Sequence, residues 1–100
     1  MLKELNDDER FVLTLERQSL VDCFEIFEDF ACGDGEYNIR LEGHHMTAEG
    51  ENTTTSIYID DYIPRRLCLP YIAIRDIKEL SWNIIKIIFL KGQIIVTPQG

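Results

Sequence analysis

The clearest folding signal in this chain lies in residues 19–33, which read SLVDCFEIFEDFACG. When these residues are spaced at about 100° each, as in an α-helix, apolar and charged side chains separate onto two arcs. The apolar arc holds Leu20, Cys23, Phe24, Ile26, Phe27, Phe30 and Ala31, with Val21 at its border. The other arc holds the carboxylates Asp22, Glu25, Glu28 and Asp29. The pattern predicts an amphipathic helix that buries one side and presents an acidic side to solvent.

Both ends of this helix carry residue types that terminate helices. The Ser19 hydroxyl can accept a hydrogen bond from the first turn, and Asp22 stands three positions later, where an acidic side chain can reach back. Gly33 can adopt the left-handed backbone conformation that closes a last turn. We therefore expect the helix to begin at Ser19 and to end at Gly33.

Alternating apolar and polar residues predict strands before and after the helix. The strands are expected over residues 10–17, 37–42, 53–59, 71–75, 84–90 and 93–97. Between them we expect a loop over 43–52, an irregular segment bracketed by Pro64 and Pro70, and a single turn over 76–80.

This order of elements, β-α-β-β-β-β-β, predicts an α+β fold. One helix would pack on a mostly antiparallel, curved sheet of about five or six strands. A chain of 100 residues suffices for one hydrophobic core, so residues 1–100 are expected to form a single domain.

The last two predicted strands carry apolar residues on both faces. A two-residue turn at Lys91 and Gly92 would group Ile85, Ile87, Phe89, Ile94 and Val96 on one face, and Ile84, Ile88, Leu90 and Ile95 on the other. A three-residue turn changes the grouping but still leaves branched apolar residues on each face. Because a single helix covers one face only, the second face needs a curled-over part of the sheet or another chain. The simplest second chain is another copy, in a homodimer.

The charge balance restricts the possible partners. The chain has 18 acidic and 10 basic residues, and its formal net charge is -8. This field repels phosphate backbones, and the adjacent basic pair Arg65 and Arg66 cannot supply the clustered contacts of a nucleic-acid interface. The longest apolar stretch, residues 84–90, is too short to span a membrane. We therefore expect a basic protein partner, and neither a nucleic acid nor a membrane.

Cysteine usage and the first residues indicate a compartment. The three cysteines, Cys23, Cys32 and Cys68, have neither the number nor the spacing of a disulfide framework or a zinc knuckle. Cys23 and Cys68 are expected to be buried as small apolar residues. The first ten residues are charged and lack the apolar core of a signal peptide. These features favour a reducing, cytoplasmic location.

No combination of residues predicts catalysis or cofactor binding. A nucleophile needs a base and an orienting group beside it, and the sequence marks no such trio. Glycine-rich phosphate-binding loops are also missing from the sequence. His44 and His45 are adjacent, so on a strand they would point to opposite faces and could share a metal ion only in a turn. We expect no enzymatic activity, cofactor or metal; a small metal-binding domain or enzyme using His44 and His45 is an alternative.

The carboxylates Asp22, Glu25, Glu28 and Asp29 are the candidate partner-binding residues. Opposite charges four positions apart stabilise a surface helix by about 0.2–0.5 kcal/mol per pair. This chain has no Lys or Arg between Asp22 and Tyr37, and Glu25 and Asp29 repel each other. Tolerated repulsion of this kind favours a surface kept for a cationic partner. We therefore expect a small acidic binding or regulatory protein, such as an inhibitor or immunity-type protein, with a structural homodimer subunit as the alternative.

Overall fold

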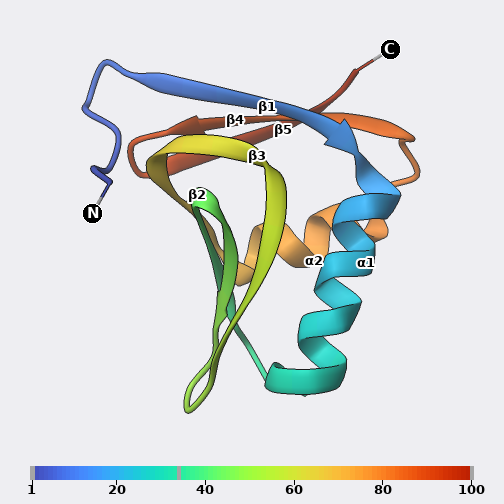
Figure 1. Cartoon of the computed structure of the whole chain (residues 1–100). Coiled ribbons are helices and arrows are strands. Elements are labelled where there is room, and N and C mark those ends of the chain that lie inside the picture. Colours follow the sequence, from blue (N-terminus) through green and yellow to red (C-terminus); the bar gives the residue numbers. More distant parts are fainter. Residues whose placement is uncertain (1, 34, 100) are drawn as a thin grey trace.

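The chain folds into five strands, two α-helices and one π-helical turn over residues 2–33 and 35–99, which the computed structural model describes (Figure 1). In order, the elements are β1 (Arg10–Glu16), α1 (Arg17–Phe27), the π-helical turn η1 (Glu28–Cys32), β2 (Asn38–Glu49), β3 (Thr54–Leu69), α2 (Tyr71–Glu79), β4 (Ile84–Leu90) and β5 (Gln93–Pro98). The strands form two antiparallel sheets, one ordered β1-β4-β5 and one made of β2 and β3. The predicted α+β class is confirmed, although the expected single sheet is divided in two and a second helix is present.

The three-stranded sheet contains the predicted C-terminal hairpin. β4 lies in its centre, between β1 and β5. Leu90 and Gln93 pair across a two-residue turn in which Gly92 has the required positive φ of 76°. The inner face of β4 carries Ile85, Ile87 and Phe89, which are at most 2% exposed. The predicted hairpin and its two-residue register are confirmed, with β5 one residue longer than expected.

β2 and β3 form a long ribbon that differs from the prediction. Strand pairing continues through residues 43–49, expected to be a loop, and on both sides of Pro64, expected to interrupt the chain. Register shifts on both sides of Gly43 leave extra β3 residues outside the ladder, so Pro64 removes no ladder hydrogen bond. The bulges also fold the ribbon back on itself. Arg40 Nη1 lies 3.2 Å from Glu49 Oε2, nine residues along the same strand, whereas a straight strand of that length spans about 30 Å.

α2 replaces the short strand and turn expected over residues 71–80. Ile72 and Ile74 alternate as they would on a strand, but only Ile74 is buried, together with Ile77 three positions later, and Ile72 is 67% exposed. Pro70 precedes the helix, and its carbonyl oxygen accepts hydrogen bonds from the N–H groups of Ala73 and Ile74 at 3.0 and 3.1 Å. The strand prediction is wrong because the helical spacing of the two isoleucines decides which face packs on the core.

α1 begins at Arg17, before the expected cap at Ser19. The N-cap residue is Glu16, and no side chain caps the helix. The Arg17 guanidinium fixes the first turn instead, because it donates from Nε to the Trp82 carbonyl oxygen at 3.0 Å and from Nη1 to the Ile77 carbonyl oxygen at 3.4 Å. The capping role predicted for Ser19 is therefore wrong, since a tertiary contact sets the start of the helix.

The helix ends in the π-helical turn η1. The Gly33 N–H donates to the Glu28 carbonyl oxygen at 3.0 Å, across five residues instead of the four of an α-helix. Gly33 has φ 58° and ψ -135°. The predicted positive φ is confirmed, but the backbone is not in the left-handed helical conformation. The side chains of Ala31 and Cys32 lie outside the described part of the structure, so the place of Ala31 on the apolar arc stays a prediction.

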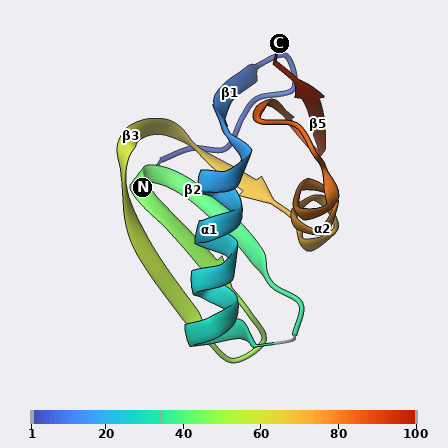
Figure 2. The same cartoon turned by 90° about the vertical axis from the view of Figure 1, so that its right-hand side faces the viewer.

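The core lies where α1, α2 and the ribbon meet the inner face of the three-stranded sheet (Figure 2). The buried residues of α1 are Leu20, Val21, Phe24 and Phe27. Cys23 is half-buried and Cys68 is exposed, so the burial predicted for Cys68 is wrong: Leu67 and Leu69 point inward, and the side chain between them points outward. Across residues 2–33 and 35–99, no helix combines the length and apolar character that crossing a membrane requires.

Candidate functional site

Two apolar side chains of the first helix stand in solvent, although the sequence placed them on the buried arc. Phe30 is 81% exposed and Ile26 is 43% exposed. Among the described residues, Phe30 is the most exposed large apolar side chain. The two are four positions apart, the spacing that brings side chains to one side of a helix. They form an apolar stripe on the outer side of α1 and η1.

The position of the buried stripe explains the exposure of both side chains. Val21, at the border of the predicted arc, is buried. The centre of the buried side of the helix therefore lies closer to Val21 than the sequence predicted, and Ile26 lies on the opposite, exposed side. Phe27 is fully buried, and a regular α-helix would keep Phe30 near it. The wider π-helical turn rotates the chain by less than about 100° per residue, so Phe30 falls outside the buried stripe.

Three of the predicted carboxylates lie beside this apolar stripe. Asp22, Glu25 and Asp29 are all exposed. Asp22 Oδ1 accepts a hydrogen bond from Gln18 Nε2 at 2.8 Å, and within residues 2–33 and 35–99 neither Glu25 nor Asp29 forms an ion pair. These carboxylates and the stripe share one side of the helix. We call the set Asp22, Glu25, Ile26, Asp29 and Phe30 the α1 face.

Glu28, the fourth predicted carboxylate, serves a different purpose. Its two oxygens lie 2.8 and 2.9 Å from Lys78 Nζ of α2, and Oε2 also accepts a hydrogen bond from the Tyr37 hydroxyl. Partial burial acts to raise the pKa of Glu28, but the hydrogen bonds from Lys78 and Tyr37 and the charge of Lys78 outweigh it, so the pKa is lowered. Glu28 therefore joins η1 to α2 and to Tyr37, the residue before β2, and the expected lack of a compensating cation does not hold for this residue.

The histidine pair lies on strand β2 and not in the expected loop. The His44 ring is stacked on Tyr58, with ring centroids 5.4 Å apart, and tilted against Tyr62 at 5.3 Å. Its Nδ1 lies 3.2 Å from the Ile59 carbonyl oxygen, while His45 is exposed. The described residues contain no group of three or more His, Cys, Asp or Glu side chains placed to hold a metal ion. The structure therefore places His44 in an aromatic cluster.

The two described thiols lack the features of an activated nucleophile. Burial, and to a lesser degree the Asp22 carboxylate, raise the pKa of the Cys23 thiol. Although the Cys68 side chain is exposed, partial desolvation of its thiol and the Glu49 carboxylate raise its pKa, against a smaller opposing effect of Arg66. A reactive cysteine needs a lowered pKa.

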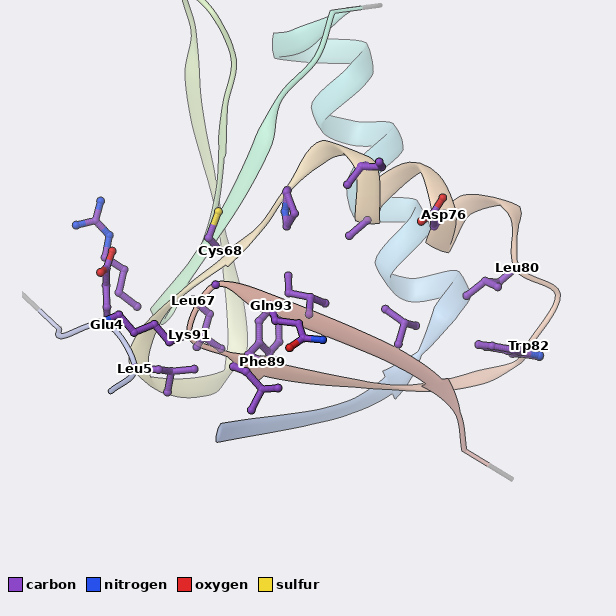
Figure 3. A pocket seen from close by; sticks show the side chains of 18 residues that line it. Glu4, Leu5, Leu67, Cys68, Asp76, Leu80, Trp82, Phe89, Lys91 and Gln93 are labelled. Atoms are coloured by element: carbon purple, nitrogen blue, oxygen red, sulfur yellow. The ribbon is translucent and has the colours of Figure 1, made fainter. Parts of the chain in front are cut away.

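A groove lies between α2 and the C-terminal hairpin. It has a volume of about 760 Å³, and we call it the β5–α2 groove (Figure 3). Apolar side chains from four parts of the chain line it, among them Leu5, Leu67, Ala73, Phe89, Ile94 and Val96. Sequence reasoning missed this groove because residues 71–79 were expected to form a strand and a turn.

No protein family model matches the chain, and the searches of curated proteins and of solved structures return no match.

Proposed function

We propose that this chain is a small acidic binding protein without enzymatic activity, and that it regulates a basic partner protein by docking through the α1 face. The observation that carries the proposal is Phe30, which is 81% exposed beside the carboxylates Glu25 and Asp29. An inhibitor or immunity-type protein is the class that this surface fits best.

The chemistry of the α1 face suits such a contact. Binding energy at protein interfaces concentrates in a few central side chains, commonly aromatic, inside a polar rim. Burying one phenylalanine contributes about 1.5–3 kcal/mol, and Ile26 adds apolar area beside it. The three carboxylates, together with the net charge of -8, accelerate the encounter with a positive surface. The partner should therefore offer an apolar pocket with Lys or Arg at its edge.

The free thiols Cys23 and Cys68 fit a reducing compartment, and we place the protein in the cytoplasm. There, an inhibitor of this kind would act by covering the partner's basic surface. Its net charge would also keep it away from nucleic acids that compete for such a surface.

Site-specific photo-crosslinking tests the proposal. A benzophenone amino acid replaces Phe30 in one sample and Tyr58 of β3, which is 67% exposed, in a matched control, and both are irradiated in a lysate of the source organism. We expect a basic protein to be crosslinked from position 30 and not from position 58, with a yield that falls as salt is raised. Equal products from both positions, or products insensitive to salt, would contradict docking through the α1 face.

A homodimer is a second candidate, and one observation favours it. Val12, Ile88 and Ile95 lie opposite one another on three neighbouring strands, so they form an apolar row across the outer face of the three-stranded sheet. Val12 is 42% and Ile95 37% exposed. We expect sedimentation velocity to show a dimer that Ile88→Lys dissociates. A strict monomer at tens of micromolar would reject this candidate.

A further inference from the structure

The second edge of the three-stranded sheet is open. β5 pairs with β4 only, and the Gln99 N–H donates to the Ile84 carbonyl oxygen at 3.0 Å. Hydrogen-bonded pairs alternate along an antiparallel ladder, so Ile95 and Thr97 direct their backbone groups to β4, while Ile94 and Val96 direct theirs outward. Within residues 2–33 and 35–99, these outward backbone groups of Ile94 and Val96 have no hydrogen-bond partner.

The open edge lies directly beside the β5–α2 groove. On the inner face of the sheet, Phe89 of β4 is 2% exposed, but its cross-strand neighbour Ile94 is only half-buried, as is Val96. The elements that pack on the inner face of the sheet therefore bury β4 but leave β5 partly exposed. α2 lies across the groove from β5 (Figure 3) and contributes Ile72, Ala73 and Asp76 to its lining.

We propose that the edge of β5 and the β5–α2 groove bind an extended peptide segment of a partner protein, which adds to the sheet as a fourth, antiparallel strand. Only a strand can supply the alternating donors and acceptors that the backbone groups of Ile94 and Val96 need. Every second side chain of the peptide then enters the groove between β5 and α2. This surface is separate from the α1 face, and the proposal does not depend on it.

The side chains around the edge define the chemistry of the peptide. β5 reads QIIVTP and carries no charge, although exposed edges are usually protected by charged residues. Ile94 and Val96 favour β-branched or other apolar side chains opposite them. Asp76, exposed on the α2 wall, favours Lys or Arg in the segment that passes it. The ligand is therefore an extended segment with alternate apolar residues and a basic residue.

A foreign peptide fits this edge better than a second copy does. Two copies that pair through β5 would be related by a two-fold axis perpendicular to the sheet, which keeps both α2 helices on the same face. α2 lies below β5 in both views of the chain (Figures 1 and 2). The two α2 helices would therefore approach each other below the new β5–β5 pair. An isolated peptide adds its strand without a second helix.

Amide hydrogen exchange measured by NMR tests the proposal directly. The probe is a synthetic peptide of about eight residues, long enough to pair with β5, with Val at alternate positions, Thr between them and Arg at both ends. We expect the amides of Ile95 and Thr97 to be protected in the free protein. Saturating peptide should slow exchange at Ile94 and Val96 by about tenfold or more. No change at these two amides at millimolar peptide would overturn the proposal.

Two methylated peptides provide the matched control. In an antiparallel pair, the peptide residues that bond to Ile94 and Val96 have their side chains in the groove. N-methylation of the Val residues should therefore abolish binding, whereas N-methylation of the Thr residues should leave the affinity within about threefold. Equal affinity of the two methylated peptides would show that the peptide binds without joining the sheet, and would overturn strand addition.

Protein variants separate the remaining explanations. Val96→Pro removes an outward N–H without breaking the β4–β5 ladder and should abolish binding, whereas Ile95→Lys on the outer face and Glu25→Lys on α1 should not. Concentration-dependent protection of Ile94 and Val96 without any peptide would identify a second copy as the occupant and would overturn the assignment to a foreign peptide.

Discussion

Phe27 and Phe30 lie three positions apart in one helical segment and have opposite environments. Phe27 is fully buried, whereas Phe30 is 81% exposed. The change from an α-helix to a π-helical turn occurs between them. A helix can thus divide its apolar residues between two environments when its twist changes: Phe27 belongs to the core, and Phe30 is exposed to solvent.

The largest expected effect is on the buried member of the pair. Phe27→Ala should lower the free energy of unfolding by about 3–5 kcal/mol, because a cavity replaces a fully buried ring. Urea denaturation followed by circular dichroism measures this loss. Phe30→Ala is the matched control and should stay within about 0.5 kcal/mol of the unmodified protein. Similar losses for the two variants would show that the two rings do not differ in burial.

The next effect belongs to the exposed member and concerns binding. Phe30→Ala should weaken the complex with the partner captured through position 30 by about 2 kcal/mol, roughly thirtyfold in Kd. Calorimetric titration of the purified pair measures this change, and Tyr58→Ala, at another highly exposed aromatic side chain, should leave Kd unchanged. An unchanged Kd for Phe30→Ala would leave its exposure without a role in binding.

A smaller effect on stability is expected at Glu28, which lies between Phe27 and Phe30 in the sequence. Its pKa in the folded chain lies below the ordinary value of 4.5, so its stabilisation is complete above pH 4.5 and is lost as pH falls through the lowered pKa. Glu28→Gln should cost about 1–2 kcal/mol near neutral pH, and the difference from the unmodified protein should shrink in acid. Glu25→Gln, on the exposed side, is the matched control and should change the free energy of unfolding near neutral pH by less than about 0.5 kcal/mol. A constant difference for Glu28→Gln would argue against its ion pair with Lys78.

The smallest effect on stability is expected from charge reversal around Phe30. Glu25→Lys combined with Asp29→Lys should change the free energy of unfolding by less than about 0.5 kcal/mol, because exposed charges contribute little. The association rate with the basic partner should nevertheless fall, and its dependence on salt should flatten. Stopped-flow measurements at several salt concentrations provide the test. An unchanged rate at low salt would place the binding site away from the α1 face.

Local signals predicted the parts of the fold that depend on neighbouring residues. The alternation over residues 84–97 and the Lys91-Gly92 turn specify the β4–β5 hairpin by themselves. The β2–β3 ribbon depends on bulges near Gly43 and on pairing between distant residues, which alternation alone does not encode. α2 was missed because, over nine residues, an alternating pattern and a helical pattern are hard to separate.

The candidate site was predicted in part for the same reason. Helical periodicity identified Asp22, Glu25 and Asp29, which are exposed, because a regular helix fixes their direction. It could not show the Lys78 partner of Glu28, which lies fifty residues away. It also placed Phe30 inside, because the π-helical turn is a departure from the regular twist that periodicity assumes. Side chains from four separate segments line the β5–α2 groove, so no local sequence pattern predicts it.

The pairing of β1 with β4 has a consequence for how the chain is made. Leu13 of β1 pairs with Ile87 of β4, so β1 cannot join its sheet until β4 has been synthesised. During synthesis β1 leaves the ribosome with its apolar face and both edges uncovered, and it keeps them until β4 has followed. Long-range pairing of this kind slows folding and prolongs the exposure of aggregation-prone edges. The newly made β1 therefore stays open to pairing with other unpaired strands until β4 is available.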